Sequence, residues 1–337
     1  MDMDQTQPPT REAGPPFAEP DADLILRTSD GVNFRMHRLL LAKCSPVFAD
    51  ILSLPAPPST EPALMEVAET ERAIRFLLDY CYWRLPNVLR PKEAAEFAPD
   101  ALEDLQIALH LSDKYHVDEM HALAIRALST LSQTKPVQVY AIAWTQRNRP
   151  LLLQAARASL SQPFTEDIPN IPEFENVPGT AVLRLFQYQQ QCKIAAVKAA
   201  THSDWLDDEI FPGAYIEPDY EDWDGTYEHI CSSPLACPNE KARMQLWAND
   251  GRWQWALLPW LYTYFTSARG ALRKCARGSS VEAYDVMYPA LKAASVELEC
   301  ISNSCAEQAL RVVPRMAKLL SAQVEKVIDE VHLETPF

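Results

Sequence analysis

One group of side chains in the sequence has the residue types and spacing of a metal site. His229, Cys231 and Cys237 follow one another as His-x-Cys-x5-Cys, and Cys275 would supply a fourth ligand. Thiolate and imidazole are the ligands that tetrahedral zinc takes in structural sites. The group contains no Cys-x-x-Cys pair, however, and isolated cysteines more often pack as small buried hydrophobes. We therefore favour packing thiols, expect no cofactor, and keep zinc as the alternative.

Catalytic motifs are missing from the sequence. The pair Cys300 and Cys305, a substitute for Cys275 in a zinc site, is five positions apart on an expected helix and so lies on different faces. No Cys/His combination stands in a recognised nucleophile context. GxxxxGK[ST], GxGxxG, GxSxG and HExxH are all absent. We expect a protein that is not an enzyme; a metal-binding or enzymatic C-terminal half using the His/Cys set is the alternative of another class.

The composition is that of a globular chain. Its 337 residues, 47% hydrophobic and 23% charged, suffice for two domains. No apolar run approaches the roughly 20 residues of a membrane helix, so we expect no membrane segment. The eight scattered cysteines do not resemble a disulfide scaffold and indicate a reducing cytoplasm or nucleus. The net charge of −15 disfavours nucleic acid as a partner.

Two stretches of the C-terminal half have an unusual composition. Residues 201–231 hold ten carboxylates and no Lys or Arg. Aromatic residues among these carboxylates would suit a basic partner, but a solvated surface loop is the favoured interpretation. The Trp-rich stretch 247–260 has little nearby basic charge, so we interpret it as core and not as a stacking platform for nucleic acid.

The elements near the N-terminus are predicted by local signals. Leu24–Thr28 is a short apolar run, and Val32–Met36 alternates as a half-buried strand does. Between them Asp30-Gly31 predicts a two-residue turn with positive φ at both central positions. The apolar segment Leu39–Ala42 follows, and Ser45-Pro46 predicts a capped helix start. The chain is thus expected to run strand, turn, strand, short helix, capped helix.

This order resembles the start of the BTB/POZ domain, and a second segment resembles its end. The first segment, residues 21–48, reads DADLILRTSDGVNFRMHRLLLAKCSPVF. The second, residues 108–128, reads ALHLSDKYHVDEMHALAIRAL and is similar to the closing helical hairpin of that family. The resemblance covers residues 21–131 and implies an α+β fold, a small sheet with helical hairpins. An insert at 85–99 departs from the common pattern and is associated with fungal members.

The resemblance also implies a function. BTB/POZ domains are protein-interaction and self-association modules, so we expect protein partners and a homodimer. Asp23 and Arg38 match positions where many such dimers place an acidic and a basic residue at the floor of the subunit groove. A substrate adaptor for a cullin-type ubiquitin ligase is one role implied by the family; a transcriptional co-regulator or scaffold is the other.

The predicted domain organisation has five parts. They are a proline-rich disordered leader (1–20), the BTB/POZ domain (21–131), a helical extension that resembles the BACK-like region of the family (132–161), a Pro-rich linker (162–179) and a mostly α-helical C-terminal region of unassigned family (180–337).

Overall fold

The structure is a computed structural model. It describes residues 10–54, 62–84, 99, 101–162, 171–202, 205, 215–216, 244–247, 254–257, 259–296 and 304–337. The chain divides into two compact units, Met1–Leu131 and Ser132–Phe337. The predicted first domain also ends at residue 131.

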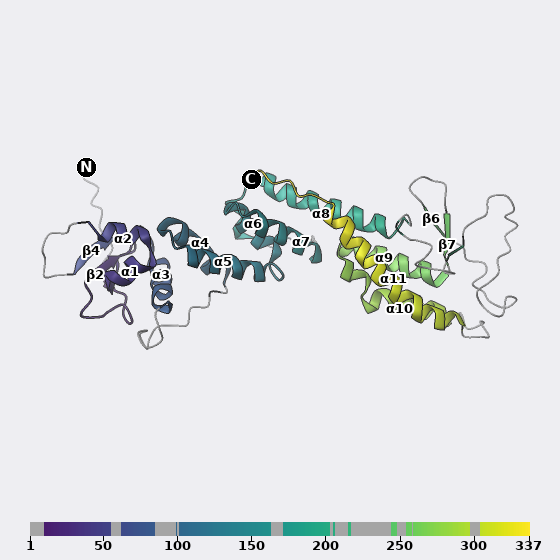
Figure 1. The fold of residues 1–337 in the computed structure, drawn as a ribbon, viewed down its shortest axis with the longest axis horizontal. Helices are drawn as coiled ribbons and strands as arrows, with labels where there is room; N and C mark the ends of the chain where they lie inside the picture. Colours follow the sequence, from purple (N-terminus) through teal and green to yellow (C-terminus); the bar gives the residue numbers. More distant parts are fainter. Residues whose placement is uncertain are drawn as a thin grey trace. The chain divides into compact units, whose positions relative to one another are not determined.

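The first unit contains a four-stranded sheet of order β1-β3-β2-β4. Two of its strands, β2 and β4, are labelled in Figure 1. Its strands are β1 (Arg11–Glu12), β2 (Leu24–Arg27), β3 (Val32–Met36) and β4 (Ala63–Glu66). β2 and β3 are antiparallel, whereas β1 joins β3 and β4 joins β2 in parallel. The alternation predicted for Val32–Met36 is present: Val32, Phe34 and Met36 are fully buried on one face. The core therefore lies against this face of the sheet.

The turn between β2 and β3 differs from the prediction at one residue. Gly31 has a φ of 81°, but Asp30 does not adopt a positive φ. Its carboxylate accepts hydrogen bonds from the Thr28 hydroxyl at 2.6 Å and from the Glu71 N–H at 3.0 Å. These two contacts hold Asp30 in ordinary backbone geometry, so Gly31 alone supplies the left-handed residue.

Five helices complete the described part of the first unit. They are α1 (Arg38–Cys44), α2 (Pro46–Leu52), α3 (Glu71–Trp83), α4 (Leu102–Tyr115) and α5 (Asp118–Leu131). The pairs α1–α2 and α4–α5 are helical hairpins, and the second turns at His116 with a φ of 53°. Most of the insert 85–99 lies outside the described residues.

The two sequence segments that carry the family resemblance meet in the core. Ser45, from the first segment, donates a hydrogen bond to the carbonyl of Tyr115, from the second, at 2.6 Å. The rings of Phe48 and Tyr115 stack with centroids 4.3 Å apart and planes 18° apart. Both contacts join residues about 70 positions apart, so they fix the first hairpin to the second.

The predicted disordered leader is wrong for its second half. Residues 10–20 are part of the folded unit: β1 pairs with β3, and Phe17 is fully buried against Phe34 and Tyr82. One large aromatic side chain among the prolines provides the burial that composition alone did not predict. The fold therefore begins before Asp21. Residues 1–9 lie outside the described residues.

The second unit is mostly helical. Its helices are α6 (Pro136–Thr145), α7 (Arg149–Ala158), α8 (Gly179–Ala199), α9 (Pro259–Lys274), α10 (Tyr284–Val296) and α11 (Ser304–Asp329), with 3-10 turns η2 (Ser159–Ser161), η3 (Pro172–Phe174) and η5 (Gly278–Val281). A small antiparallel sheet adds β5 (Tyr215–Ile216), β6 (Met244–Trp247) and β7 (Gln254–Leu257) in the order β5-β7-β6. Among the described helices, none combines the length and apolar character needed to cross a membrane.

The stretch 162–179 does not separate two units, contrary to the prediction. The Tyr140 hydroxyl on α6 donates to the Ala181 carbonyl on α8 at 3.0 Å. Gln189 on α8 donates to the Ser159 hydroxyl at 2.7 Å, and both residues are buried. Helices before and after the prolines thus share one core, because proline ends helices without preventing their packing.

A charged network joins three elements of the second unit. Arg157 on α7 pairs with Glu325 on α11 at 2.5 Å and also with Asp329. Glu325 accepts from the Arg277 side chain at 3.1 Å and from the Gly278 N–H at 2.7 Å. These ion pairs and hydrogen bonds therefore connect α7, near the start of the second unit, to α11, its last helix.

Candidate interaction surface

The α1–α2 hairpin is shaped by one residue, Ser45. Its extended backbone (φ −139°, ψ 123°) ends α1, and its hydroxyl accepts from the Phe48 N–H at 3.2 Å to cap α2. Pro46 stands at the first position of α2, where no N–H is needed. Two short helices are therefore joined without a loop, and only one side of each faces the core.

Three large apolar side chains of this hairpin are exposed. Leu39 is 62% exposed, Ile51 42% and Leu54 67%. They lie at one end of the hairpin, because the guanidinium of Arg38 in the first turn of α1 donates to the carbonyl of Leu52 at the end of α2, at 3.0 Å. We call Leu39, Ile51 and Leu54 the hairpin face. Single exposed leucines are ordinary, whereas several exposed large apolar residues at one end of a hairpin suit a contact surface.

The structure brings the predicted residues Asp23 and Arg38 together beside the hairpin face. The carboxylate of Asp23 accepts from the backbone N–H of Arg38 at 2.8 Å. The helix N-cap, His37, provides no side-chain cap, so Asp23 satisfies one of the free N–H groups at the start of α1. The two residues are therefore in contact, but the Arg38 guanidinium points to Leu52 instead.

β4 leaves one edge of the sheet without a strand neighbour in the described part of the unit. It follows β2 at the end of the strand order, and the Ala63 N–H donates to the carbonyl of Asp23 at 3.2 Å. Leu64 on this strand is 51% exposed. An edge strand presents main-chain groups that another strand can pair with. The first residue of β4 is therefore bonded to Asp23, the residue whose carboxylate contacts Arg38.

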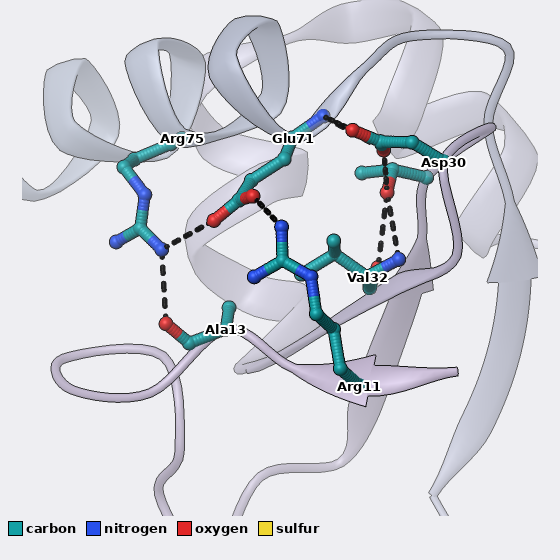
Figure 2. Close-up of polar contacts among 7 residues, drawn as sticks. Arg11, Ala13, Asp30, Val32, Glu71 and Arg75 are labelled. Atoms are coloured by element: carbon teal, nitrogen blue, oxygen red, sulfur yellow. Dashed lines mark hydrogen bonds and ion pairs between the residues drawn. The ribbon is translucent and has the colours of Figure 1, made fainter. Parts of the chain in front are cut away.

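The opposite edge of the sheet is covered by the N-terminal segment, which ionic contacts fasten to α3 (Figure 2). Arg75 donates to the carbonyl of Ala13 at 2.9 Å and to Glu71 at 3.1 Å, while Arg11 pairs with the same Glu71. Hydrogen bonds from Arg75 and Arg11 hold the pKa of Glu71 below its usual range. Arg75 also lies 5.5 Å from the Phe17 ring centroid. β1 is thus a two-residue edge strand, Arg11–Glu12, and these contacts fix it to α3.

The BTB/POZ family model matches residues 18–131. This match, together with the sheet, the two hairpins and the contact of Ser45 with Tyr115, decides the identity of the first unit. Residues 18–131 are a BTB/POZ domain. Such a domain is a non-catalytic module for protein-protein interaction and self-association. Comparison with curated proteins found no match for the chain.

A buried carboxylate, that of Glu69, joins the end of α4 to the segment just before α3. Glu69 accepts from the Tyr115 hydroxyl at 2.6 Å and pairs with Lys114, while its backbone carbonyl accepts from Ser29. Burial raises the pKa of Glu69, but the hydrogen bonds from Lys114 and Tyr115 outweigh burial, so the pKa lies below its usual value. Lys114 and Tyr115 of the closing hairpin thus fix the chain just before α3.

The zinc candidates are not brought together in the described part of the chain. His229, Cys231, Cys237 and Cys300 lie outside the described residues, and of Cys305 only its place in α11 is described. Cys275 is a half-buried free thiol directly after α9. The described residues contain no group of three or more potential metal ligands. Zinc therefore stays a sequence-based hypothesis.

The unusual stretches of the C-terminal half are described at only a few positions. Trp205 of the acidic stretch donates its indole N–H to the Ala199 carbonyl at 2.8 Å, so this aromatic residue lies against the end of α8. Trp260 is fully buried, as expected for core. The side chains of Trp247, Trp253 and Trp255 lie outside the described part.

The exposed hairpin face was not predicted from the sequence. A signal for it exists: Leu39, Leu40, Leu41 and Ala42 are consecutive apolar residues on a seven-residue helix. Four consecutive positions are distributed around about 300° of the helix, so they cannot all face one core. Leu41 takes the buried position, and Leu39 is left exposed.

Proposed function

We propose that this protein is an assembly module that self-associates through the hairpin face of its BTB domain. The observation that carries the proposal is the exposure of Leu39, Ile51 and Leu54 at one end of the hairpin. Burial of apolar surface is the main driving force of stable association. Three such residues on one small surface would form the apolar centre of an interface.

A twofold symmetric contact suits this surface. In such a dimer the same patch from both copies forms the interface, so an apolar face pairs with itself. Asp23 and Arg38 lie beside the hairpin face and would form part of the polar rim that surrounds the apolar centre of an interface. The β4 edge adjoins the same region and would extend the contact through main-chain hydrogen bonds.

Charge substitutions in the hairpin face test this proposal. Leu39→Glu with Leu54→Glu would place four carboxylates in the symmetric contact, and we expect the full chain to become monomeric by light scattering. Leu310→Glu is the matched control, because Leu310 is 62% exposed on α11 of the second unit; it should keep the wild-type mass. A double variant that retains the wild-type mass, or a control that becomes monomeric, would refute the assigned face.

The second unit would then select the partner that the dimer brings into a complex. We propose a protein partner, with an adaptor role for a cullin-type ubiquitin ligase as the first candidate and a transcriptional or scaffolding assembly as the second. Support for this role comes from the BTB domain itself. Affinity purification of the full chain with mass spectrometry distinguishes the candidates: a recovered cullin supports the first, and recovery of a co-repressor without a cullin supports the second.

A further inference from the structure

The last residues of the second unit lie as an extended segment against α6 and α8 (Figure 1). Their burial alternates. Val331, Leu333, Thr335 and Phe337 are buried or half-buried, whereas the three residues between them are exposed. Leu333 is buried, and the Phe337 ring meets the Trp144 ring edge-on with centroids 5.4 Å apart. A period of two is that of an extended peptide with one face against a groove.

The two helices that form the floor of this groove, α6 and α8, are fixed to each other. Tyr140 on α6 is bonded to the Ala181 carbonyl on α8, which fixes the two helices to each other. The guanidinium of Arg184 lies 5.9 Å from the Trp144 ring centroid, so α6 and α8 together form one apolar and cationic floor. A floor fixed in this way is preorganised for an occupant.

The segment itself is held by few main-chain contacts. Arg184 reaches the Glu334 carbonyl at 3.4 Å, and the Val331 N–H bonds back to Ile328 at 3.1 Å. Its anchors are the side chains of Leu333 and Phe337, four positions apart. Segments with few buried contacts open at low free energy, so this occupant is replaceable.

The segment does not fill all the space beside α8. A cavity of about 370 Å³ follows α8, bordered by Leu333 on one side and by Gln187, Gln190, Gln191 and Ile194 on the other. Ile194 is 67% exposed. Glutamine amides both donate and accept hydrogen bonds, which suits the N–H and C=O groups of a peptide backbone. Apolar anchors beside amide side chains therefore favour a peptide as the occupant.

We propose that the groove between α6 and α8 binds an extended segment of a partner protein with a leucine and a phenylalanine four positions apart, and that residues 331–337 occupy it in cis. The proposal concerns the second unit and does not depend on BTB self-association. An intramolecular occupant acts at an effective concentration on the order of millimolar. A partner segment thus binds when it outcompetes the cis segment or when that segment is released.

Fluorescence anisotropy with a labelled peptide of residues 331–337 tests the proposal. The receptor is the full chain carrying Leu333→Ser and Phe337→Ser, which releases the cis segment. We expect this variant to bind the peptide at least tenfold more tightly than the wild-type chain. A peptide with the same two serine replacements is the control probe, and it should not bind. Adding Arg184→Glu to the receptor should weaken binding of the unmodified peptide at least tenfold, whereas adding Leu310→Glu should not.

Three results would overturn the proposal. The first is that the folded double variant does not bind the peptide, and the second is that the wild-type chain binds it equally well. The third is that the double variant differs in mass from the wild-type chain by light scattering, which would show that copies exchange the segment. Circular dichroism checks the fold. Phe337→Ala alone is the milder variant, since Phe337 is half-buried, and it should bind the peptide severalfold more tightly than wild type.

Discussion

The carboxylate of Asp23 accepts a hydrogen bond from the backbone N–H of Arg38 at 2.8 Å. The residue before the central strand of the sheet is thereby joined to the first residue of α1. Asp23 bonds to the main chain of Arg38 and not to its side chain. The guanidinium of Arg38 therefore donates its hydrogen bond to the carbonyl of Leu52. These two contacts of Arg38 therefore join the sheet to the start of α1 and the start of α1 to the end of α2, near the exposed Leu39 and Leu54.

A double-mutant cycle distinguishes this arrangement from an ion pair. Asp23→Ala removes a helix cap and should lower the free energy of unfolding by about 1 kcal/mol. Arg38→Ala removes the bond to Leu52 but keeps its N–H, at a similar cost of about 1 kcal/mol. The double variant should equal the sum to within about 0.5 kcal/mol in urea unfolding at fixed protein concentration. Coupling well above that value would mean that the two side chains pair directly.

Ser45→Ala should be among the more damaging small substitutions in the BTB domain. It leaves the buried Tyr115 carbonyl without the 2.6 Å hydrogen bond and removes the cap of α2. We expect a loss of about 1–3 kcal/mol in unfolding free energy. Ser53→Ala is the matched control, since the exposed Ser53 hydroxyl bonds only locally to Asp50; it should stay within about 0.5 kcal/mol of wild type. Equal effects of the two changes would refute the role given to Ser45.

The predictable part of this fold is the part with local signals. Alternation at Val32–Met36, the Asp30-Gly31 turn and the Ser45-Pro46 cap each lie within a few residues, and the structure has a strand, a turn and a helix start there. The proximity of Asp23 and Arg38 followed from the family resemblance. The resemblance did not predict that the Asp23 carboxylate contacts the backbone N–H of Arg38 and not its guanidinium. That detail depends on where α1 begins relative to β2.

The unpredicted parts depend on partners far away in the sequence. Residues 10–20 are proline-rich, and their order comes from Phe17 in the core and from Arg75 and Glu71, about 60 positions later. Similarly, the prolines of 162–179 indicated a boundary, while Tyr140 and Ala181 join the helices on either side. Composition measures local preference and carries no information on such long-range contacts.

The stability of the BTB domain should depend on Glu69 at acidic pH. The folded pKa of Glu69 lies below the ordinary value of 4.5, so its contribution is complete above about pH 4.5 and is lost as the pH falls through the folded pKa. Glu69→Gln should flatten the fall in unfolding free energy in this window, measured by urea unfolding from pH 7 to pH 3. Tyr115→Phe removes one hydrogen bond to the carboxylate and should flatten it partly. A Glu69→Gln curve parallel to that of wild type would contradict the depressed pKa.

Gly278 should tolerate no side chain where η5 meets α11. A Cβ at this position would lie 2.5 Å from the Ser321 carbonyl oxygen, so Gly278→Ala should destabilise the second unit by about 1–3 kcal/mol. Gly270→Ala is the opposite case, because nothing lies within 4 Å of a Cβ there and Gly270 is within α9. It should stabilise by about 0.5–1 kcal/mol. Thermal unfolding of both variants checks whether each change raises or lowers the stability. A Gly278→Ala variant as stable as wild type would show that α11 can move away from the added Cβ at no cost.

Self-association of the full chain is the central claim, and sedimentation equilibrium measures it most directly. The chain mass is 38.0 kDa. A dimer formed through Leu39, Ile51 and Leu54 predicts twice this mass at micromolar concentration, with dissociation to the chain mass only on dilution. A mass of 38.0 kDa at every concentration up to the highest soluble one would contradict the account.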